Sequence, residues 1–127
     1  MKPMRVLLVD DEKEFVSTLN ERLLLRGIES DWATSAEEAL KKAEGTKYDL
    51  AVLDVKMPRV SGIELKRMLH KRYPGMHFIF MTGHGSEQDF HAGSSEAGAD
   101  YYLVKPVQIE DLVRKMNEVL SQRQPER

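Results

Sequence analysis

Carboxylates follow two short apolar segments of this 127-residue chain, and acids in such positions could hold a metal ion. Residues 7–9 lead directly into Asp10, Asp11 and Glu12, and residues 50–53 lead into Asp54. Ionised carboxylates about 5 Å apart repel by roughly 3 kcal/mol per pair at an effective dielectric of ~20, so such a cluster needs a cation. The ligands are hard oxygens and the chain has no cysteine, so Mg²⁺ or Mn²⁺ fits better than zinc or copper.

Strand-length apolar segments alternate with helix-length amphipathic segments five times, which is typical of a parallel sheet covered on both faces. The pattern predicts strands at residues 5–9, 28–33, 50–53, 77–81 and 101–104. In a doubly wound sheet, ligands bind beyond the carboxyl ends of the strands. The residues that the sequence places there are Asp10, Asp11, Asp54, Thr82 and Lys105. One acid after a strand is often only a helix cap, so the prediction depends on the whole set.

The helices that should cover this sheet have recognisable ends. The first, at residues 13–26, should stop at Gly27, and the pairs Ser35 with Glu38 and Ser61 with Glu64 form capping-box patterns. Leu65, Met68 and Leu69 follow the second box at helical spacing. The last helix has an apolar stripe of Ile109, Leu112, Val113, Met116 and Leu120. The fourth helix, between residues 87 and 98, contains an interior glycine and two serines, so we expect it to be short, frayed or mobile.

Size and composition limit the other classes of protein. The length suits one domain, which we expect to span residues 1–122 before a flexible tail at 123–127. A net charge of −2 argues against direct nucleic-acid binding, and the absence of cysteine excludes disulfides. No apolar run reaches the roughly 20 residues of a membrane helix or resembles a signal peptide, so the sequence predicts a cytoplasmic protein without membrane contact.

Four motifs carry a resemblance to a known family. They are residues 9–11 (VDD), residues 53–58 (LDVKMP) with residues 61–62 (SG), residues 81–83 (MTG), and residues 97–106 (AGADYYLVKP). Over residues 4–121 the sequence resembles the receiver domain of a two-component response regulator, of the chemotaxis-regulator type. The resemblance implies an α/β, flavodoxin-like fold, with five parallel strands in the order 2-1-3-4-5 and five helices.

The resemblance also implies a phosphorylation site. Asp54 would accept a phosphoryl group from a histidine kinase or a histidine phosphotransfer protein. Asp11 would bind Mg²⁺ directly, Asp10 would bind it through water, and the backbone carbonyl of Lys56 would supply a further oxygen. After transfer, Lys105 and the Thr82 hydroxyl would contact phosphoryl oxygens. The peptide bond before Pro106 is expected to be cis.

Signalling would follow from a conformational switch. By resemblance, Thr82 moves toward the phosphoryl group and Tyr102 turns inward, which changes the face formed by the fourth helix, fifth strand and fifth helix. Lys56 and His84 occupy positions that influence phosphate lifetime. Gly83 stands where the family often has alanine, and the interval from Thr82 to Lys105 is one residue longer than expected.

The leading hypothesis is therefore a signalling switch, with self-catalysed phosphotransfer and autodephosphorylation, rather than an enzyme. It would act on a downstream protein or on an effector domain that is missing here. A pseudo-receiver that serves only as an interaction module is disfavoured by the complete set of phosphorylation residues. An aspartyl-phosphate phosphatase would want an acid at position 56, which is lysine. A flavin-binding module would need a hydroxyl- and glycine-rich loop after the first strand, where this chain has acids.

Overall fold

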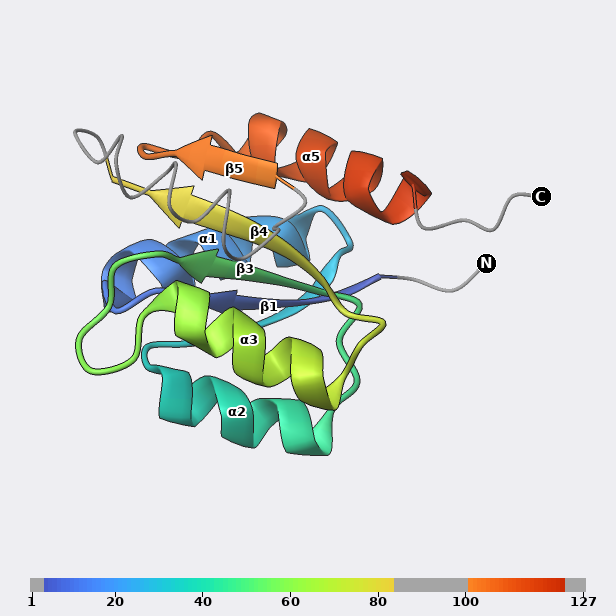
Figure 1. Cartoon of the computed structure of the whole chain (residues 1–127). Coiled ribbons are helices and arrows are strands. Elements are labelled where there is room, and N and C mark those ends of the chain that lie inside the picture. Colours follow the sequence, from blue (N-terminus) through green and yellow to red (C-terminus); the bar gives the residue numbers. More distant parts are fainter. Residues whose placement is uncertain (1–3, 84–100, 123–127) are drawn as a thin grey trace.

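The computed structural model describes residues 4–83 and 101–122, with the side chains of Tyr101 and Gln122 excepted. Five strands form one parallel sheet in the order β2-β1-β3-β4-β5 (Figure 1), as predicted. Their bounds are β1 Arg5–Val9, β2 Glu29–Ala33, β3 Leu50–Asp54, β4 His77–Thr82 and β5 Tyr101–Val104. The predicted strands match to within one residue at each end.

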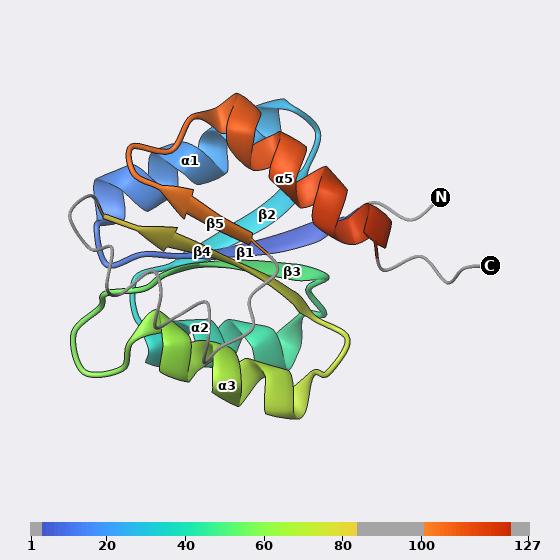
Figure 2. The same ribbon diagram turned by 45° about the horizontal axis from the view of Figure 1, so that its top comes forward.

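Four helices lie within the described residues: α1 Lys13–Leu25, α2 Ala36–Gly45, α3 Gly62–Arg72 and α5 Ile109–Gln122. Figure 2 shows α1 and α5 on one face of the sheet and α2 and α3 on the other. The helix predicted between residues 87 and 98 falls outside the described residues. No helix in residues 4–83 or 101–122 is long and apolar enough to cross a membrane.

The sheet is buried on both sides because its central strands are apolar throughout. In β1, Leu7 and Val9 join the cluster under α2 and α3, whereas Val6 and Leu8 join the cluster under α1 and α5. All four side chains are fully buried. Because both faces of the sheet are buried, the sequences of these strands are uninterrupted apolar segments and do not alternate between apolar and polar residues.

Local signals fix the helix ends largely as expected. The Ser35 and Ser61 hydroxyls accept hydrogen bonds from the backbone N–H of Glu38 and Glu64, at 3.1 and 3.2 Å. The Glu38 carboxylate accepts from the Thr34 N–H at 2.7 Å, one residue before the N-cap residue that a capping box would use. Gly27 has φ 79°, so it takes the left-handed conformation predicted for the end of α1.

Two details of the apolar faces differ from the sequence prediction. Met68 was grouped with Leu65 and Leu69, but its side chain is 42% exposed while theirs are fully buried. Position 68 lies at the border of the α3 stripe, where the flexible methionine side chain remains in solvent. In α5, Val119 is also buried, although it was absent from the predicted stripe.

Candidate phosphoacceptor site

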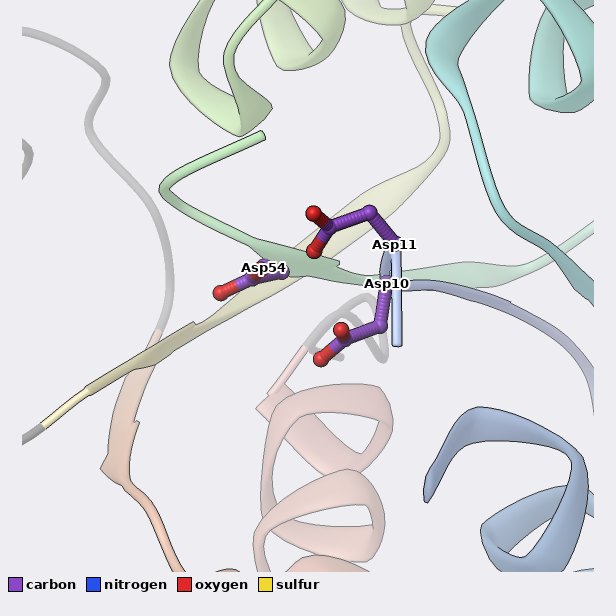
Figure 3. A group of neighbouring side chains, drawn as sticks. All are labelled: Asp10, Asp11 and Asp54. Atoms are coloured by element: carbon purple, nitrogen blue, oxygen red, sulfur yellow. The ribbon is translucent and has the colours of Figure 1, made fainter. Parts of the chain in front are cut away.

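The three predicted aspartates lie together at the carboxyl end of the sheet (Figure 3). Strands β1 and β3 pair in parallel with Val9 opposite Leu53, which brings the residues after them to the same edge. One carboxylate oxygen from each of Asp10, Asp11 and Asp54 lies within 4.8 Å of the others. Asp10 and Asp54 are buried, and Asp11 is exposed. The cluster thus combines two buried carboxylates with one that is exposed to solvent.

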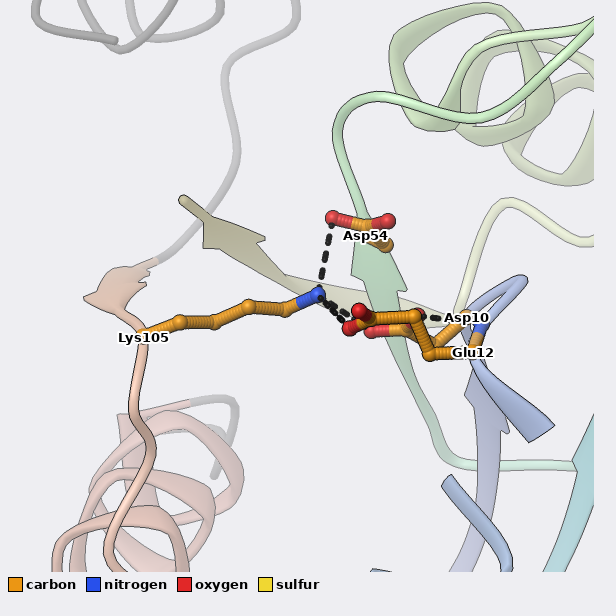
Figure 4. Close-up of polar contacts among 4 residues, drawn as sticks. All are labelled: Asp10, Glu12, Asp54 and Lys105. Carbon is orange, nitrogen blue, oxygen red and sulfur yellow. Dashed lines mark hydrogen bonds and ion pairs between the residues drawn. The ribbon is translucent and has the colours of Figure 1, made fainter. Parts of the chain in front are cut away.

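Lys105 provides a positive charge to this cluster (Figure 4). Its Nζ lies 2.7 Å from Asp10 Oδ2 and 3.5 Å from Asp54 Oδ1. A third carboxylate, that of Glu12, lies 3.4 Å from the same nitrogen. Glu12 was not among the predicted site residues, although its place in the acidic run after β1 was a visible signal. The ammonium therefore spans the two buried aspartates, and it lies closer to Asp10.

Burial disfavours the ionised form of the two buried acids of the site, Asp10 and Asp54. Burial, and then the neighbouring charge of Asp10, raise the pKa of Asp54 from 3.8 to about 7, against the opposing effect of Lys105. Burial likewise raises the pKa of Asp10, although the Lys105 ammonium and the backbone N–H of Glu12, 2.9 Å from Asp10 Oδ1, act in the other direction. Burial alone would lower the pKa of Lys105, but its contacts with Asp10 outweigh that effect and raise it.

These residues fit a divalent cation. Lys105 brings one positive charge to a group that contains four carboxylates, counting Glu12, so ionisation of all four leaves an excess of negative charge. Carboxylate oxygens are the ligands that Mg²⁺ and Mn²⁺ prefer, and Asp11 leaves room for bound water because it is exposed. The carboxylate cluster thus has the ligand chemistry that the sequence predicted.

The other predicted residues lie at the ends of β4 and β5. Thr82 is the last residue of β4 and is 3% exposed, and its carbonyl accepts a hydrogen bond from the Lys105 N–H at 2.8 Å. Tyr102 pairs with Phe80 across the sheet, and their rings are 5.3 Å apart. Lys56 is exposed in the connection from β3 to α3. His84 lies outside the described residues.

Backbone geometry holds the connections on either side of the site. The Lys105–Pro106 peptide bond is cis, as expected. In the connection from β3 to α3, the Gly62 N–H donates to the carbonyl of Val55 at 2.9 Å. A Cβ atom at Gly62 would lie 2.1 Å from the carbonyl oxygen of Asp54. Glycine at this position therefore lets the start of α3 pack directly on the backbone of Asp54.

Comparison with known proteins identifies the class. The pattern of the response regulator receiver domain family matches residues 6–117, so this chain belongs to that family, whose members are switches in two-component signalling. It is 34% identical over 124 residues to the response regulator MprA of Mycobacterium sp. (strain KMS), covering 98% of this chain and 54% of the relative. It is 38% identical over 117 residues to the two-component response regulator PhoP of Pseudomonas aeruginosa, covering 92% and 52%. The chain thus spans about half the length of these relatives.

Solved structures agree with this assignment. The CheY-like response regulator receiver domain protein of Methanospirillum hungatei superposes with a TM-score of 0.86 at 37% identity, covering 95% of this chain and 96% of the other. A receiver domain protein from Clostridium thermocellum gives 0.85 at 30% identity, with 94% and 96% covered. The predicted family and sheet order are therefore confirmed.

Proposed function

We propose that this chain accepts a phosphoryl group on Asp54 from a phosphohistidine of a histidine kinase or histidine phosphotransfer protein. The observation that carries the proposal is the position of Asp54: buried, 4.8 Å or less from two other acids through its oxygens, and in contact with Lys105. A carboxylate oxygen of Asp54 would attack phosphorus, the new P–O bond would form as the P–N bond breaks, and the imidazole nitrogen would leave with its electron pair.

Other residues of the cluster would hold the ion and the product. Asp10, Asp11, Asp54 and the backbone carbonyl of Lys56 would bind Mg²⁺, with Mn²⁺ as a substitute. When bound, the ion supplies positive charge that offsets repulsion between the anionic acceptor and the anionic phosphoryl group. Lys105 is already 3.5 Å from Asp54 Oδ1, so its ammonium needs only a small shift to pair with a phosphoryl oxygen.

The switch would involve the ends of β4 and β5. The buried Thr82 would donate a hydrogen bond from its hydroxyl to the phosphoryl group. Tyr102, whose hydroxyl is already buried and whose ring packs on Phe80, would turn further inward. This would change the face that β5 and α5 form with the predicted fourth helix, and this face would bind a downstream protein or an effector domain. Autodephosphorylation would then reset the switch, with its rate set in part by Lys56 and His84. Residues 1–122 would act as the receiver domain, in the cytoplasm and with no direct contact to membrane or nucleic acid. The tail predicted at 123–127 lies outside the described residues.

The decisive experiment is labelling with a small acyl phosphate such as radiolabelled acetyl phosphate. The wild-type protein should acquire an acid-labile label, and labelling should require Mg²⁺. Base should hydrolyse this label whether or not EDTA is present. Asp54→Ala should take no label, whereas Glu21→Gln, a change at an exposed acid of α1, should be labelled normally. Label on Asp54→Ala would remove the assignment of the acceptor, and an unlabelled wild type would favour a pseudo-receiver.

A further inference from the structure

An aromatic ring lies against the ammonium of Lys105. The centre of the Phe15 ring is 5.0 Å from Lys105 Nζ, which is within the range of a cation–π contact. Phe15 is in the first turn of α1 and is partly buried on the cluster that includes Val16 and Leu19. Its side chain belongs to the apolar face of that helix.

The ring adds an apolar contact to the ionic ones around the ammonium. Carboxylates of Asp10, Asp54 and Glu12 lie 2.7–3.5 Å from Nζ, and the ring adds an uncharged face. Phe15 also lines a surface pocket of about 630 Å³ between α1 and the connection from β5 to α5, which includes Pro106. The ring therefore borders both this pocket and the ammonium, while the Lys105 side chain is only 19% exposed.

We propose that Phe15 is a positioning residue for phosphotransfer: its ring face holds the Lys105 ammonium beside Asp54 while that ammonium moves from Asp10 to a phosphoryl oxygen. This inference rests on the proposed function. Lysine is a point charge on a flexible stem, so it needs contacts that limit where the charge can go. Attraction to a ring face has no hydrogen-bond direction, so it can persist while the ammonium exchanges one oxygen partner for another.

The test compares two substitutions at this position. Phe15→Leu keeps an apolar side chain but removes the π face, and it should lower the rate constant for labelling of Asp54 by acetyl phosphate about three- to tenfold. Phe15→Tyr keeps the π face and should restore the rate to within about twofold of wild type. Ile109→Val is the matched control, because Ile109 lines the same pocket and is buried. It should lose some stability and be labelled at the wild-type rate.

A second measurement does not depend on phosphorylation. In the metal-free protein, the ring current of Phe15 should shift the NMR signals of the Lys105 ε-methylene upfield, with the assignment made by their loss in Lys105→Arg. The shift should disappear in Phe15→Leu and persist in Phe15→Tyr and Ile109→Val. Because it can be seen in the wild-type protein, this readout remains valid even if a substitution prevents folding.

Three results would overturn the positioning role alone: wild-type labelling of Phe15→Leu, equal slowing in Phe15→Leu and Phe15→Tyr, or Lys105 signals at ordinary positions in the wild-type protein. The second result would mean that packing, and not the ring face, limits the rate. A wild-type protein that takes no label would refute the proposed function, and the positioning role with it.

Discussion

Replacing Asp54 with asparagine should stabilise the protein, and the gain should grow with pH. Burial and the charge of Asp10 raise the pKa of Asp54 from 3.8 to about 7. Between these two values the folded protein binds more protons at this site than the unfolded chain does. The free energy of unfolding therefore falls as pH rises from about 4 to about 7, and this contribution is constant above that range. The asparagine amide cannot ionise, so Asp54→Asn removes this pH-dependent decrease in the free energy of unfolding.

The magnitude follows from the shift. Each pKa unit corresponds to about 1.4 kcal/mol, so a rise from 3.8 to about 7 lowers the stability of the wild-type protein by roughly 4 kcal/mol at pH 8. About 2 of these pKa units fall in the interval from pH 5 to pH 7, so most of the decrease in stability takes place there. The stability difference between Asp54→Asn and wild type should therefore be about 3 kcal/mol larger at pH 8 than at pH 5. Asp10 is present in both proteins, so its own titration largely cancels in the comparison.

Urea denaturation in EDTA at pH 5 and pH 8 measures this difference directly. Glu21→Gln serves as the control, because it also removes a carboxylate but from the exposed surface of α1. Its stability relative to wild type should change little between the two pH values. If Asp54→Asn showed the same difference from wild type at pH 5 and pH 8, the argument that burial and Asp10 disfavour ionised Asp54 would be wrong.

Three further predictions concern the ion, the backbone and a helix cap. Mg²⁺ at ten times its dissociation constant should raise the unfolding free energy of the wild-type protein by about 1.4 kcal/mol. The same concentration should give a smaller gain in Asp11→Asn. Equal gains in urea titrations would argue against Asp11 as a ligand. Gly62→Ala should lower the free energy of unfolding by roughly 2 kcal/mol or more and slow labelling, because the new Cβ would lie 2.1 Å from the Asp54 carbonyl oxygen. A Cβ at Gly45 would meet nothing within 4 Å, so Gly45→Ala should leave the melting temperature almost unchanged. Ser61→Ala should cost about 1 kcal/mol by the same measurement, because the hydroxyl accepts from the Glu64 N–H; an unchanged melting temperature would show that the cap contributes nothing.

The residues at the strand ends could be predicted because one rule places them all. Once the alternating pattern indicates a parallel sheet, the residues after β1, β3, β4 and β5 must meet at one edge. The strand ends themselves were set slightly short. β3 includes Asp54 and β4 includes Thr82, since backbone hydrogen bonds continue past the last apolar side chain, as from the Val55 N–H to the carbonyl of Met81. The apolar pattern indicates which side chains are buried, but it does not indicate where the backbone hydrogen bonds between the strands end.

The contacts of Lys105 could not be predicted in the same way. Its closest carboxylate is Asp10, at 2.7 Å, and not the proposed acceptor. This preference depends on how far the side chain reaches from the end of β5 and on which acid is most deeply buried. Phe15 was likewise hidden, because an aromatic residue on the apolar stripe of a helix is indistinguishable in sequence from an ordinary core residue.

Under the proposed function, the resting contacts of Lys105 also explain how the site can remain folded before it reacts. The ammonium offsets part of the repulsion between Asp10 and Asp54, the two buried acids. A divalent ion bound to these acids would weaken the attraction between Asp10 and the Lys105 ammonium, since both cations compete for the negative charge of Asp10. Lys105 would then be free to follow the charge that develops beside Asp54. The same lysine can therefore stabilise the unreacted site and contact the phosphoryl group, provided that a contact such as the Phe15 ring keeps it within reach of both aspartates.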